Sequence, residues 1–466
     1  MVRITHGHCP KLEDLLNVIN GETVHVDNSV YVRLEKAREA YLYEARKGKQ
    51  IYGYCTGLGA LFDKNKGTCK PEYEDIVLKE HAVGTGEAAP ASIVRGFLFV
   101  RLTQLSQGNA PVRGLVARRI EEALNNDIIP VIPVVGSVGA SGDLVPSAHA
   151  FLCIHRGVGQ AYYGGRVVPC SKALEESGLD EVILEPGEAL ALINNTAWST
   201  SLAGLGALGI LDLLTYSIKV LKKTLRITGC NPEHYSEALV TAKKGDYNRV
   251  FLELLGDVEC DPKRLQDPYS IRCNPQIYSS LLEVANHARK LVEEEMCSST
   301  ENPLIIDGKV LHGCAFHSIK AGIASDTMLI VLANLANLVE RRIANLLSGK
   351  ITGLPEFLAT PESSVGAMIA HYVAAAITAE VRRASTPSTI NSIPTSGSQE
   401  DINPMSPDAG LKLLNAVRRV RDLVAIEEAV VEAATRINEL SNHSMLLEII
   451  RRRQEEVRKY VAPFLS

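Results

Sequence analysis

Four long proline-free tracts with apolar residues at helical spacing restrict the fold of this chain more than any other feature of its sequence. The first tract runs from Ala197 to Gly229, and its leucine and isoleucine residues fall on nearly every face of a helix. A second tract of the same kind runs from Ser318 to Ser348, while Val365 to Ser385 and Asp408 to Ala462 alternate apolar residues with Arg and Glu. Helices without a polar face need neighbours on all sides, so the pattern predicts a bundle of long helices.

The part of the chain before these tracts has a different character. Glycine and proline interrupt it often up to about Pro186, which is typical of a mixed, loop-rich region. We therefore expect two parts, a loop-rich part over residues 1–196 and a helical bundle over residues 197–466. Apolar helices of this kind also favour an oligomer, in which other copies of the chain supply the missing neighbours.

The charge balance argues against nucleic acid as a partner. The chain has 49 Lys and Arg against 54 Asp and Glu, a formal net charge of −5, and lacks the basic field that holds a phosphate backbone. With 46% hydrophobic and 22% charged residues, the composition is that of an ordinary globular protein and excludes a disordered or collagen-like chain.

The sequence also predicts a soluble, cytoplasmic protein with reduced thiols. The ten cysteines are scattered without a Cys-x-x-Cys pair, in a chain long enough to fold without disulfide bonds. The first ten residues lack the apolar run of a signal peptide. The most apolar span, Thr327 to Val339, contains Asn334 and Asn337 and falls short of the roughly 20 residues that a bilayer requires, so we expect no membrane contact.

The segment from Gly136 to Pro146 is the one most able to carry unusual chemistry. In a closely bent loop the amide nitrogen of Gly142 can attack the carbonyl carbon of Ala140, and glycine tolerates such a backbone at the lowest steric cost. Loss of the Ala140 carbonyl oxygen as one water and of the Ser141 hydroxyl as a second then gives a 4-methylidene-imidazol-5-one (MIO) ring. This electrophile would supply the electron sink that ordinary side chains lack. An ordinary tight loop is the alternative, because Ala-Ser-Gly is common by itself.

Two other kinds of site are not expected. No Gly-Lys-Ser/Thr follows the glycines, and their spacing is not G-x-G-x-x-G, so a phosphate-binding loop is disfavoured. The cluster His6-Gly-His8-Cys9 places its ligands too close together for a sound tetrahedral site, so we predict no bound metal.

The Gly136–Pro146 segment resembles the MIO-forming signature of the histidine and aromatic amino acid ammonia-lyases. Further blocks similar to that family follow the family's order, and the resemblance spans about residues 50–430. These blocks are Tyr52-Gly-Tyr-Cys-Thr-Gly-Leu-Gly59, Glu80-His-Ala-Val-Gly84, Leu190-Ala-Leu-Ile-Asn-Asn-Thr196, Gln266-Asp-Pro-Tyr-Ser-Ile-Arg-Cys273, Ala315-Phe-His317 and Ser392-Ile-Pro-Thr-Ser-Gly-Ser-Gln-Glu-Asp401. The loop signature of the related fumarase-type lyases is not found.

The resemblance implies a mainly α fold, an elongated multi-helix bundle of the ammonia-lyase and fumarase-like type with a loop-rich N-terminal part. It implies a carbon–nitrogen lyase that eliminates ammonia from a small amino acid, with the MIO as its only cofactor. It also implies a homotetramer with shared active sites, which lets Tyr52 and Arg272 meet across a subunit interface.

The resemblance assigns the chemical steps to two groups. Ala140, Ser141 and Gly142 would form the MIO, whose methylidene captures the substrate through its amino nitrogen or, in an older proposal, through its ring. Tyr52 would be the general base that removes the β-proton. It needs a depressed pKa to work near neutrality, and nearby cationic or dipolar groups must supply that shift. The alternative for Tyr52 is a core tyrosine with a satisfied hydroxyl.

Five further residues match binding positions of the family. Arg272 offers a planar fork for the substrate carboxylate. Tyr269 and Gln266 would line the ring and support proton handling, and Asn194 would donate to the substrate carboxylate or to the MIO carbonyl oxygen. Phe316 would shield the MIO from water. The plain alternatives are a surface ion pair for Arg272, a turn for Tyr269 and Gln266, a helix-terminal Asn for Asn194 and core packing for Phe316.

Two positions favour histidine as the substrate. In the resemblance, histidine-specific members carry a His at the position of His81 and a Glu at that of Glu400, whereas tyrosine- and phenylalanine-specific members tend to have Leu and Gln there. An imidazole needs hydrogen-bond partners that a phenyl ring would leave unpaired, at about 1–3 kcal/mol each. The predicted reaction converts L-histidine to trans-urocanate and ammonia.

Departures beside these positions keep an alternative open. Glu80 stands where Ser is usual, Asn195 replaces the commoner Gly, and Ile402 begins an unusual continuation after Asp401. A tyrosine or phenylalanine ammonia-lyase, or a 2,3-aminomutase of the same family, is the alternative enzyme. A helical scaffold that has lost the chemistry is the alternative without activity.

Overall fold

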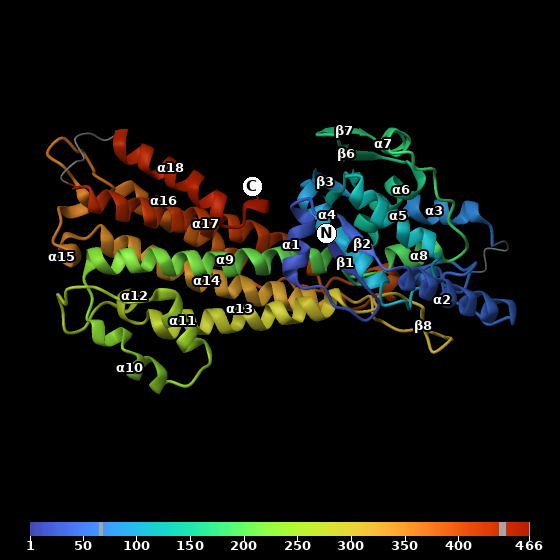
Figure 1. The fold of residues 1–466 in the computed structure, drawn as a ribbon, viewed down its shortest axis with the longest axis horizontal. Coiled ribbons are helices and arrows are strands. Elements are labelled where there is room, and N and C mark those ends of the chain that lie inside the picture. The colour runs from blue at the N-terminus through green and yellow to red at the C-terminus, as the bar shows by residue number, and fades with distance from the viewer. Residues whose placement is uncertain (65–68, 438–443, 466) are drawn as a thin grey trace. The chain divides into compact units, whose positions relative to one another are not determined.

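The computed structural model describes residues 1–64, 69–437 and 444–465, and it confirms a mainly helical fold (Figure 1). The chain forms two compact units, each built from three separate stretches of sequence. Unit 1 consists of Met1–Leu205, Lys290–Ser325 and Pro387–Leu411, and unit 2 consists of Gly206–Arg289, Asp326–Thr386 and Lys412–Ser466.

These units differ from the division at residue 197 that the sequence suggested. Residues 1–196 lie in unit 1, but the chain returns to that unit twice, at Lys290–Ser325 and at Pro387–Leu411. The four longest helices explain this, because each of them has residues in both units: α9 (Ala197–Thr228), α13 (Asn274–Met296), α14 (Ile319–Leu346) and α17 (Ser406–Thr435). The change in composition at residue 197 marks the start of α9.

Unit 1 combines shorter helices with short strands. Its remaining helices are α1 (Leu12–Ile19), α2 (Asn28–Arg46), α3 (Pro71–His81), α4 (Ala91–Leu105), α5 (Gly114–Asn125), α6 (Leu144–Arg156), α7 (Cys170–Glu176) and α8 (Glu188–Ile193). Its strands are β1 (Val2–Ile4), β2 (Val24–Val26), β3 (Thr85–Ala88), β4 (Ile129–Pro130), β5 (Pro133–Val135), β6 (Gln160–Tyr163), β7 (Arg166–Pro169), β8 (Leu304–Ile306) and β9 (Lys309–Leu311).

Helix α4 forms the centre of the unit 1 core. It is apolar on nearly every side, and its residues from Ile93 to Leu105 are all buried. Its Phe97 packs against Phe151 of α6 and Trp198 of α9, with ring centroids 6.2 and 5.8 Å apart. Such aromatic contacts stabilise a core beyond the area that they bury. The core thus fixes α6 and the start of α9, which flank the loops described below.

The strands of unit 1 form small separate sheets. β1 pairs with β2 in parallel, β3 with β5 antiparallel, and β4, β6 and β7 form an antiparallel sheet. β8 and β9 form an antiparallel hairpin in which Leu304 lies opposite Leu311. Ile305 and Val310 of this hairpin are buried in a cluster with Tyr41 of α2.

Unit 2 is a bundle in which the long helices lie side by side (Figure 1). Its other helices are α10 (Glu237–Ala242), α11 (Tyr247–Leu255), α12 (Tyr269–Arg272), α15 (Gly349–Thr352), α16 (Met368–Ala384) and α18 (Ser444–Tyr460). The buried Arg342 of α14 joins the bundle: it donates to Glu427 of α17 at 2.7 Å, to the Tyr278 hydroxyl of α13 at 2.9 Å and to Ser217 of α9 at 3.1 Å. The helical tracts expected from the sequence correspond to α9, α14, α16, and α17 with α18, and residues 438–443 lie outside the described part.

Two helical stretches, Glu188–Thr228 and Ile319–Leu346, are long and apolar enough to span a membrane by length and composition alone. The second contains the span Thr327 to Val339 and is longer than the sequence estimate. Within the most apolar window of each stretch, 78% and 72% is buried in the protein. The core helices of a globular protein have the same property, so the length is weak evidence for a membrane.

Eight of the ten cysteines form disulfide bonds: Cys9–Cys297, Cys55–Cys69, Cys153–Cys170 and Cys230–Cys260, with Cα atoms 5.0–5.5 Å apart. A disulfide spans such distances without backbone movement. The expectation of reduced thiols is therefore wrong for these residues, and only Cys273 and Cys314 are free. Partners 14 to 288 residues apart in the sequence meet through folding, which no short spacing motif reveals.

Candidate active site

The loop between β5 and α6 holds the tripeptide 140–142 in a closely bent conformation. Gly139 and Gly142 have φ angles of +75° and +78°, which favour glycine. A Cβ atom on Gly142 would lie 2.3 Å from the Asn195 carbonyl oxygen, so only glycine fits there. The Gly139 carbonyl oxygen accepts hydrogen bonds from the backbone N–H and the hydroxyl of Ser318, at 3.1 and 3.0 Å. These features account for Gly139 and Gly142 of the signature.

Asp143 anchors the end of this loop. Its carboxylate is fully buried and accepts hydrogen bonds from the Ser137 hydroxyl at 3.0 Å and from the backbone N–H and hydroxyl of Ser199 at 2.8 and 2.9 Å. Burial raises the pKa of Asp143 to about 6, and the hydrogen bonds from Ser199 and Ser137 oppose this shift. The sequence showed Asp143 only as part of the signature and gave it no role.

Ser141 is held from two sides. Its hydroxyl donates to the Glu400 carboxylate over 2.5 Å, and the other Glu400 oxygen accepts from the Thr395 hydroxyl at 2.6 Å. The Asn194 side-chain amide donates to the Ser141 carbonyl oxygen over 2.5 Å. The other polar atom of that amide, Asn194 Oδ1, is buried without a hydrogen-bond partner among the described residues. A buried acceptor of this kind favours a ligand that donates to it.

The Tyr52 block forms a tight turn beside this loop. Gly53 has φ of +79°, and a Cβ atom there would lie 2.2 Å from Leu190 Cδ2. The Gly53 N–H donates to the Thr56 hydroxyl at 2.9 Å, and the Gly59 N–H donates to the Tyr52 hydroxyl at 2.8 Å. Close packing therefore explains Gly53, the bond to Thr56 closes the turn, and the bond from the Gly59 N–H holds the phenol of Tyr52.

The electrostatics around Tyr52 differ from the expectation. Burial raises the pKa of its phenol above the ordinary value, the negative charge of Glu400 raises it further, and the Gly59 N–H opposes the rise. The depressed pKa that a base near neutrality needs is therefore not supplied by the described residues of unit 1.

His81 ends α3 on the wall of the same site. Its Nδ1 lies 2.7 Å from the Val77 carbonyl oxygen. In the neutral ring Nδ1 therefore carries the proton, and Nε2 is left as an acceptor. This arrangement suits a ligand group that donates a hydrogen bond.

Two adjoining cavities of unit 1 bring these side chains together. The larger, about 410 Å³, and the smaller, about 290 Å³, share the walls formed by Tyr52, Ser141, Asn194 and Glu400. Ala140 and Phe316 line only the larger cavity, and His81 lines only the smaller one. Unit 1 thus joins eight of the predicted residues, counting Gly142 in the loop, around a space for a small molecule.

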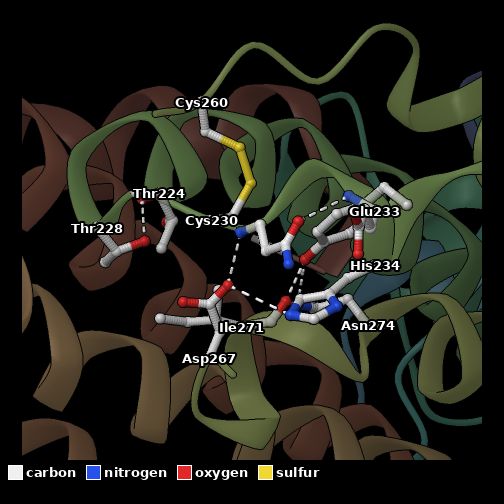
Figure 2. The surroundings of a disulfide bond; sticks show 12 residues. Thr224, Thr228, Cys230, Glu233, His234, Cys260, Asp267, Ile271 and Asn274 are labelled. Carbon is white, nitrogen blue, oxygen red and sulfur yellow. Dashed lines mark hydrogen bonds and ion pairs between the residues drawn. A yellow bond between two sulfur atoms is a disulfide. The ribbon is translucent and has the colours of Figure 1, made fainter. Parts of the chain in front are cut away.

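The other three predicted residues belong to unit 2. Gln266, Tyr269 and Arg272 lie in and before α12, where the Arg272 guanidinium is 4.8 Å from the centre of the Tyr269 ring. Figure 2 shows the surroundings of this segment: the buried Asp267 lies below the Cys230–Cys260 disulfide. Tyr269 is 70% exposed, so it is presented on the surface of unit 2.

Sequence reasoning missed residues that touch the predicted ones. The backbone N–H of Tyr52 donates to His312 Nε2 at 3.1 Å, and Thr395 donates to Glu400. Thr395 lies inside a quoted block, so its position was a usable signal. His312 stands outside the blocks, and its contact arises from the packing of the β8–β9 hairpin.

Among the described residues, no group of three or more His, Cys, Asp or Glu side chains is arranged to hold a metal ion. In the cluster near the amino terminus, Cys9 is bonded to Cys297, and His6 Nδ1 lies 3.2 Å from the Ser106 carbonyl oxygen.

Comparisons with known proteins identify the family of this chain. A family model described as aromatic amino acid lyase matches residues 11–459. A "probable histidine ammonia-lyase" of Thermoplasma acidophilum is 33% identical over 90% of this chain and 87% of its own length. A histidine ammonia-lyase of Bacillus cytotoxicus is 34% identical over 92% of this chain and 87% of its own length. In fold, the chain resembles the solved structure of a tyrosine aminomutase from Streptomyces globisporus, with a TM-score of 0.90, 24% identity, and 100% and 97% of the two chains covered.

Proposed function

Because the chain belongs to the aromatic amino acid lyase family and is a carbon–nitrogen lyase, we propose that it is a histidine ammonia-lyase that converts L-histidine to trans-urocanate and ammonia. The observation that carries this proposal is the convergence of Ser141, Asn194, Tyr52, His81 and Glu400 on adjoining cavities of unit 1. Both named relatives of similar length are histidine ammonia-lyases by name.

The residues of the loop fit an MIO. Gly142 has the bent backbone and the absence of a Cβ that ring closure onto Ala140 requires. The Ser141 carbonyl oxygen, which would become the carbonyl oxygen attached to the ring, already accepts a hydrogen bond from Asn194. When formed, the MIO supplies an electrophile that activates the amino group of the substrate for departure. No other cofactor is required.

Tyr52 is proposed to take the β-proton of the substrate. The Gly59 N–H holds the phenol oxygen and stabilises its phenolate form. Because burial and Glu400 raise the pKa of Tyr52, a nearby cation must offset them before Tyr52 can act as a base near neutrality. Arg272, proposed to arrive from another subunit, would supply this cation and grip the substrate carboxylate.

His81 and Glu400 are proposed to hold the imidazole ring. His81 Nε2 is an acceptor, and the Glu400 carboxylate is a second acceptor on the shared wall of the cavities. An imidazolium ring has two N–H donors that can satisfy both. A phenyl ring would leave His81 Nε2 unpaired, at about 1–3 kcal/mol, and would give Glu400 no donor beyond the Thr395 hydroxyl.

A homotetramer with shared active sites is the proposed assembly. Gln266, Tyr269 and Arg272 are accessible on unit 2, where they can complete the site of another copy. Apolar side chains on α16, namely Ile369, Tyr372 and Val373, are also exposed. Large exposed apolar groups of this kind mark surfaces for association.

We further propose a cytoplasmic location without nucleic acid or membrane partners. The net charge of −5 and the burial of both long apolar helices support this proposal. The disulfides have precedents in intracellular proteins of hyperthermophiles.

Product formation with three substrates tests the proposal. The purified protein is incubated with L-histidine, L-tyrosine or L-phenylalanine while the absorbance of the unsaturated product is followed, and chromatography detects any β-amino acid. We expect urocanate from histidine and no turnover by Ser141→Ala. A cinnamate, coumarate or β-amino acid product without urocanate would favour the alternative lyase or aminomutase. Equal activity of Ser141→Ala would exclude the MIO.

A further inference from the structure

Tyr52 is fixed at its backbone as well as at its hydroxyl. Its backbone N–H donates to Nε2 of His312 over 3.1 Å, and its phenol oxygen accepts from Gly59 at 2.8 Å. His312 directly follows β9 and lines the larger cavity of the site together with Tyr52. The imidazole thus lies between a rigid hairpin and the proposed base.

The β8–β9 hairpin gives His312 a fixed position. At its open end the Gly313 N–H donates to the Asn302 side-chain oxygen at 3.0 Å. The Ile305 N–H donates to the Asn109 carbonyl oxygen at 2.9 Å, and the side chains of Ile305 and Val310 are buried against α2. These contacts fix the hairpin and therefore the position of His312 at its end.

The chain before Tyr52 is attached to the same hairpin. The Lys49 ammonium donates to the Val310 carbonyl oxygen at 2.7 Å, and Ile51 is buried in one cluster with Ile305 and Val310. Among the hairpin contacts that the structure shows, only the hydrogen bond to His312 involves Tyr52 itself. The hairpin therefore sets where the Tyr52 turn begins.

The hydrogen bond fixes the state of His312. Nε2 accepts only in the neutral ring, so the proton of the ring is on Nδ1. Burial and the charge of Lys49 both lower the pKa of His312, which keeps the ring neutral. His312 and Lys49 also line a third cavity, of about 450 Å³, in which Tyr52, Tyr54 and Asp63 are the other titratable groups.

We propose that His312 is a positioning residue for the reaction, which holds the backbone of Tyr52 so that the phenol meets the β-proton of the substrate. This inference rests on the proposed function, because it takes Tyr52 to be the base. The side chain touches no reacting atom. Its loss should lower kcat and leave KM nearly unchanged, because a displaced base affects the chemical step more than binding.

Three variants separate the hydrogen bond from mere packing. In His312→Gln, the side-chain oxygen reaches the place of Nε2 and can accept from Tyr52. In His312→Asn, the oxygen reaches only the place of Nδ1, and His312→Leu has no acceptor. His8→Asn, at an exposed position of the same unit, is the matched control.

Amide hydrogen exchange of peptides covering residues 50–60 is measured together with kcat and KM for L-histidine. In His312→Asn and His312→Leu we expect the amide of Tyr52 to exchange up to about tenfold faster and kcat to fall by up to about tenfold. Both quantities should stay close to wild type in His312→Gln and His8→Asn. If His312→Leu does not fold, the Gln and Asn pair decides.

The two proposals can fail separately. If the wild type does not turn over L-histidine, the proposed function fails, while hydrogen exchange still tests the hold of His312 on Tyr52. Equal exchange and equal kcat in the Gln and Asn variants would overturn the positioning role. A change in KM alone would overturn it as well, because it would place His312 in substrate binding.

Discussion

Asn194 holds the loop of the site, and we propose that it also stabilises negative charge that develops there during the reaction. Its amide donates to the Ser141 carbonyl oxygen in a buried position, where a hydrogen bond is worth more than in water. The sequence suggested this donor role, with the substrate carboxylate as the other possible partner. In the structure, the Asn194 amide donates to the loop, at the Ser141 carbonyl oxygen.

We expect Asn194→Ala to lower kcat for L-histidine by about 10²- to 10³-fold, the usual effect of removing such a donor. Steady-state kinetics measure this, and an intact mass equal to that of the processed wild type, corrected for the substitution, shows that the loop has still matured. Asn126→Ala, at the exposed end of α5, is the control. An Asn194→Ala enzyme within twofold of wild type would contradict the assignment.

The raised pKa of Asp143 predicts that the stability of the fold depends on pH. Its pKa is raised from 3.8 to about 6 in the folded chain, so the folded state binds more protons than the unfolded state between these values. Stability should therefore fall as pH rises from about 4 to about 6, by up to about 3 kcal/mol, and then level off.

The variant Asp143→Asn should lack this dependence. Its amide can donate to the Ser137 and Ser199 hydroxyls, while its oxygen accepts from the Ser199 N–H. Urea unfolding of both proteins at pH 5 and pH 8 measures the difference. The free energy of unfolding of the variant minus that of the wild type should be larger at pH 8 than at pH 5. Only the wild type loses the contribution of the protonated carboxyl as the pH rises. A difference that is the same at both pH values would show that Asp143 is not the titrating group.

At the scale of elements, the long helices other than α13 were predicted from the sequence because their pattern is local, whereas no helix was expected over Asn274–Met296. Proline-free tracts with apolar residues at helical spacing indicated α9, α14 and α16 within a few residues. The return of the chain to unit 1 at Lys290–Ser325 and Pro387–Leu411 was not predictable, because a helix pattern carries no information about which neighbour it packs against. The same limit hid the disulfides.

The candidate site shows the same contrast. Blocks resembling a family located Tyr52, Ser141, Asn194 and Glu400, which meet in unit 1. His312 was missed because its hydrogen bond depends on the seating of a hairpin 260 residues further along. The raised pKa of Tyr52 was also missed, since burial is a property of the folded chain.

Arg342 should contribute strongly to the unit 2 bundle. Its guanidinium and the Glu427 carboxylate are both fully buried, so removing one partner leaves an uncompensated charge. We expect Arg342→Met to cost about 3–5 kcal/mol in urea unfolding, and the double variant Arg342→Met/Glu427→Leu to recover most of it. A single variant as stable as wild type would contradict this view of the core.

The cysteine pairing leads to a direct chemical prediction. Freshly purified protein, denatured without a reductant, should react with a thiol reagent at two cysteines, Cys273 and Cys314. After reduction all ten should react. Ten reactive thiols before reduction would contradict the four disulfides and restore the expectation from the sequence.

At the scale of the whole molecule, the proposed sharing of sites predicts complementation between inactive chains. Ser141→Ala removes the loop chemistry of unit 1, and Arg272→Ala removes the carboxylate grip of unit 2. Mixed tetramers of the two variants, formed by coexpression, should regain part of the wild-type activity, since some sites then combine two intact halves. Mixed tetramers that stay inactive would indicate sites built from one chain.

The central claim is that three neighbouring residues condense into a ring, and intact mass tests it most directly. Closure of Gly142 onto Ala140 expels one water, and loss of the Ser141 hydroxyl expels another. After reduction of the disulfides, the active wild type should therefore be lighter than its encoded chain by two molecules of water, and Ser141→Ala should not show that full loss. A wild-type enzyme that makes urocanate at its full encoded mass would contradict the account.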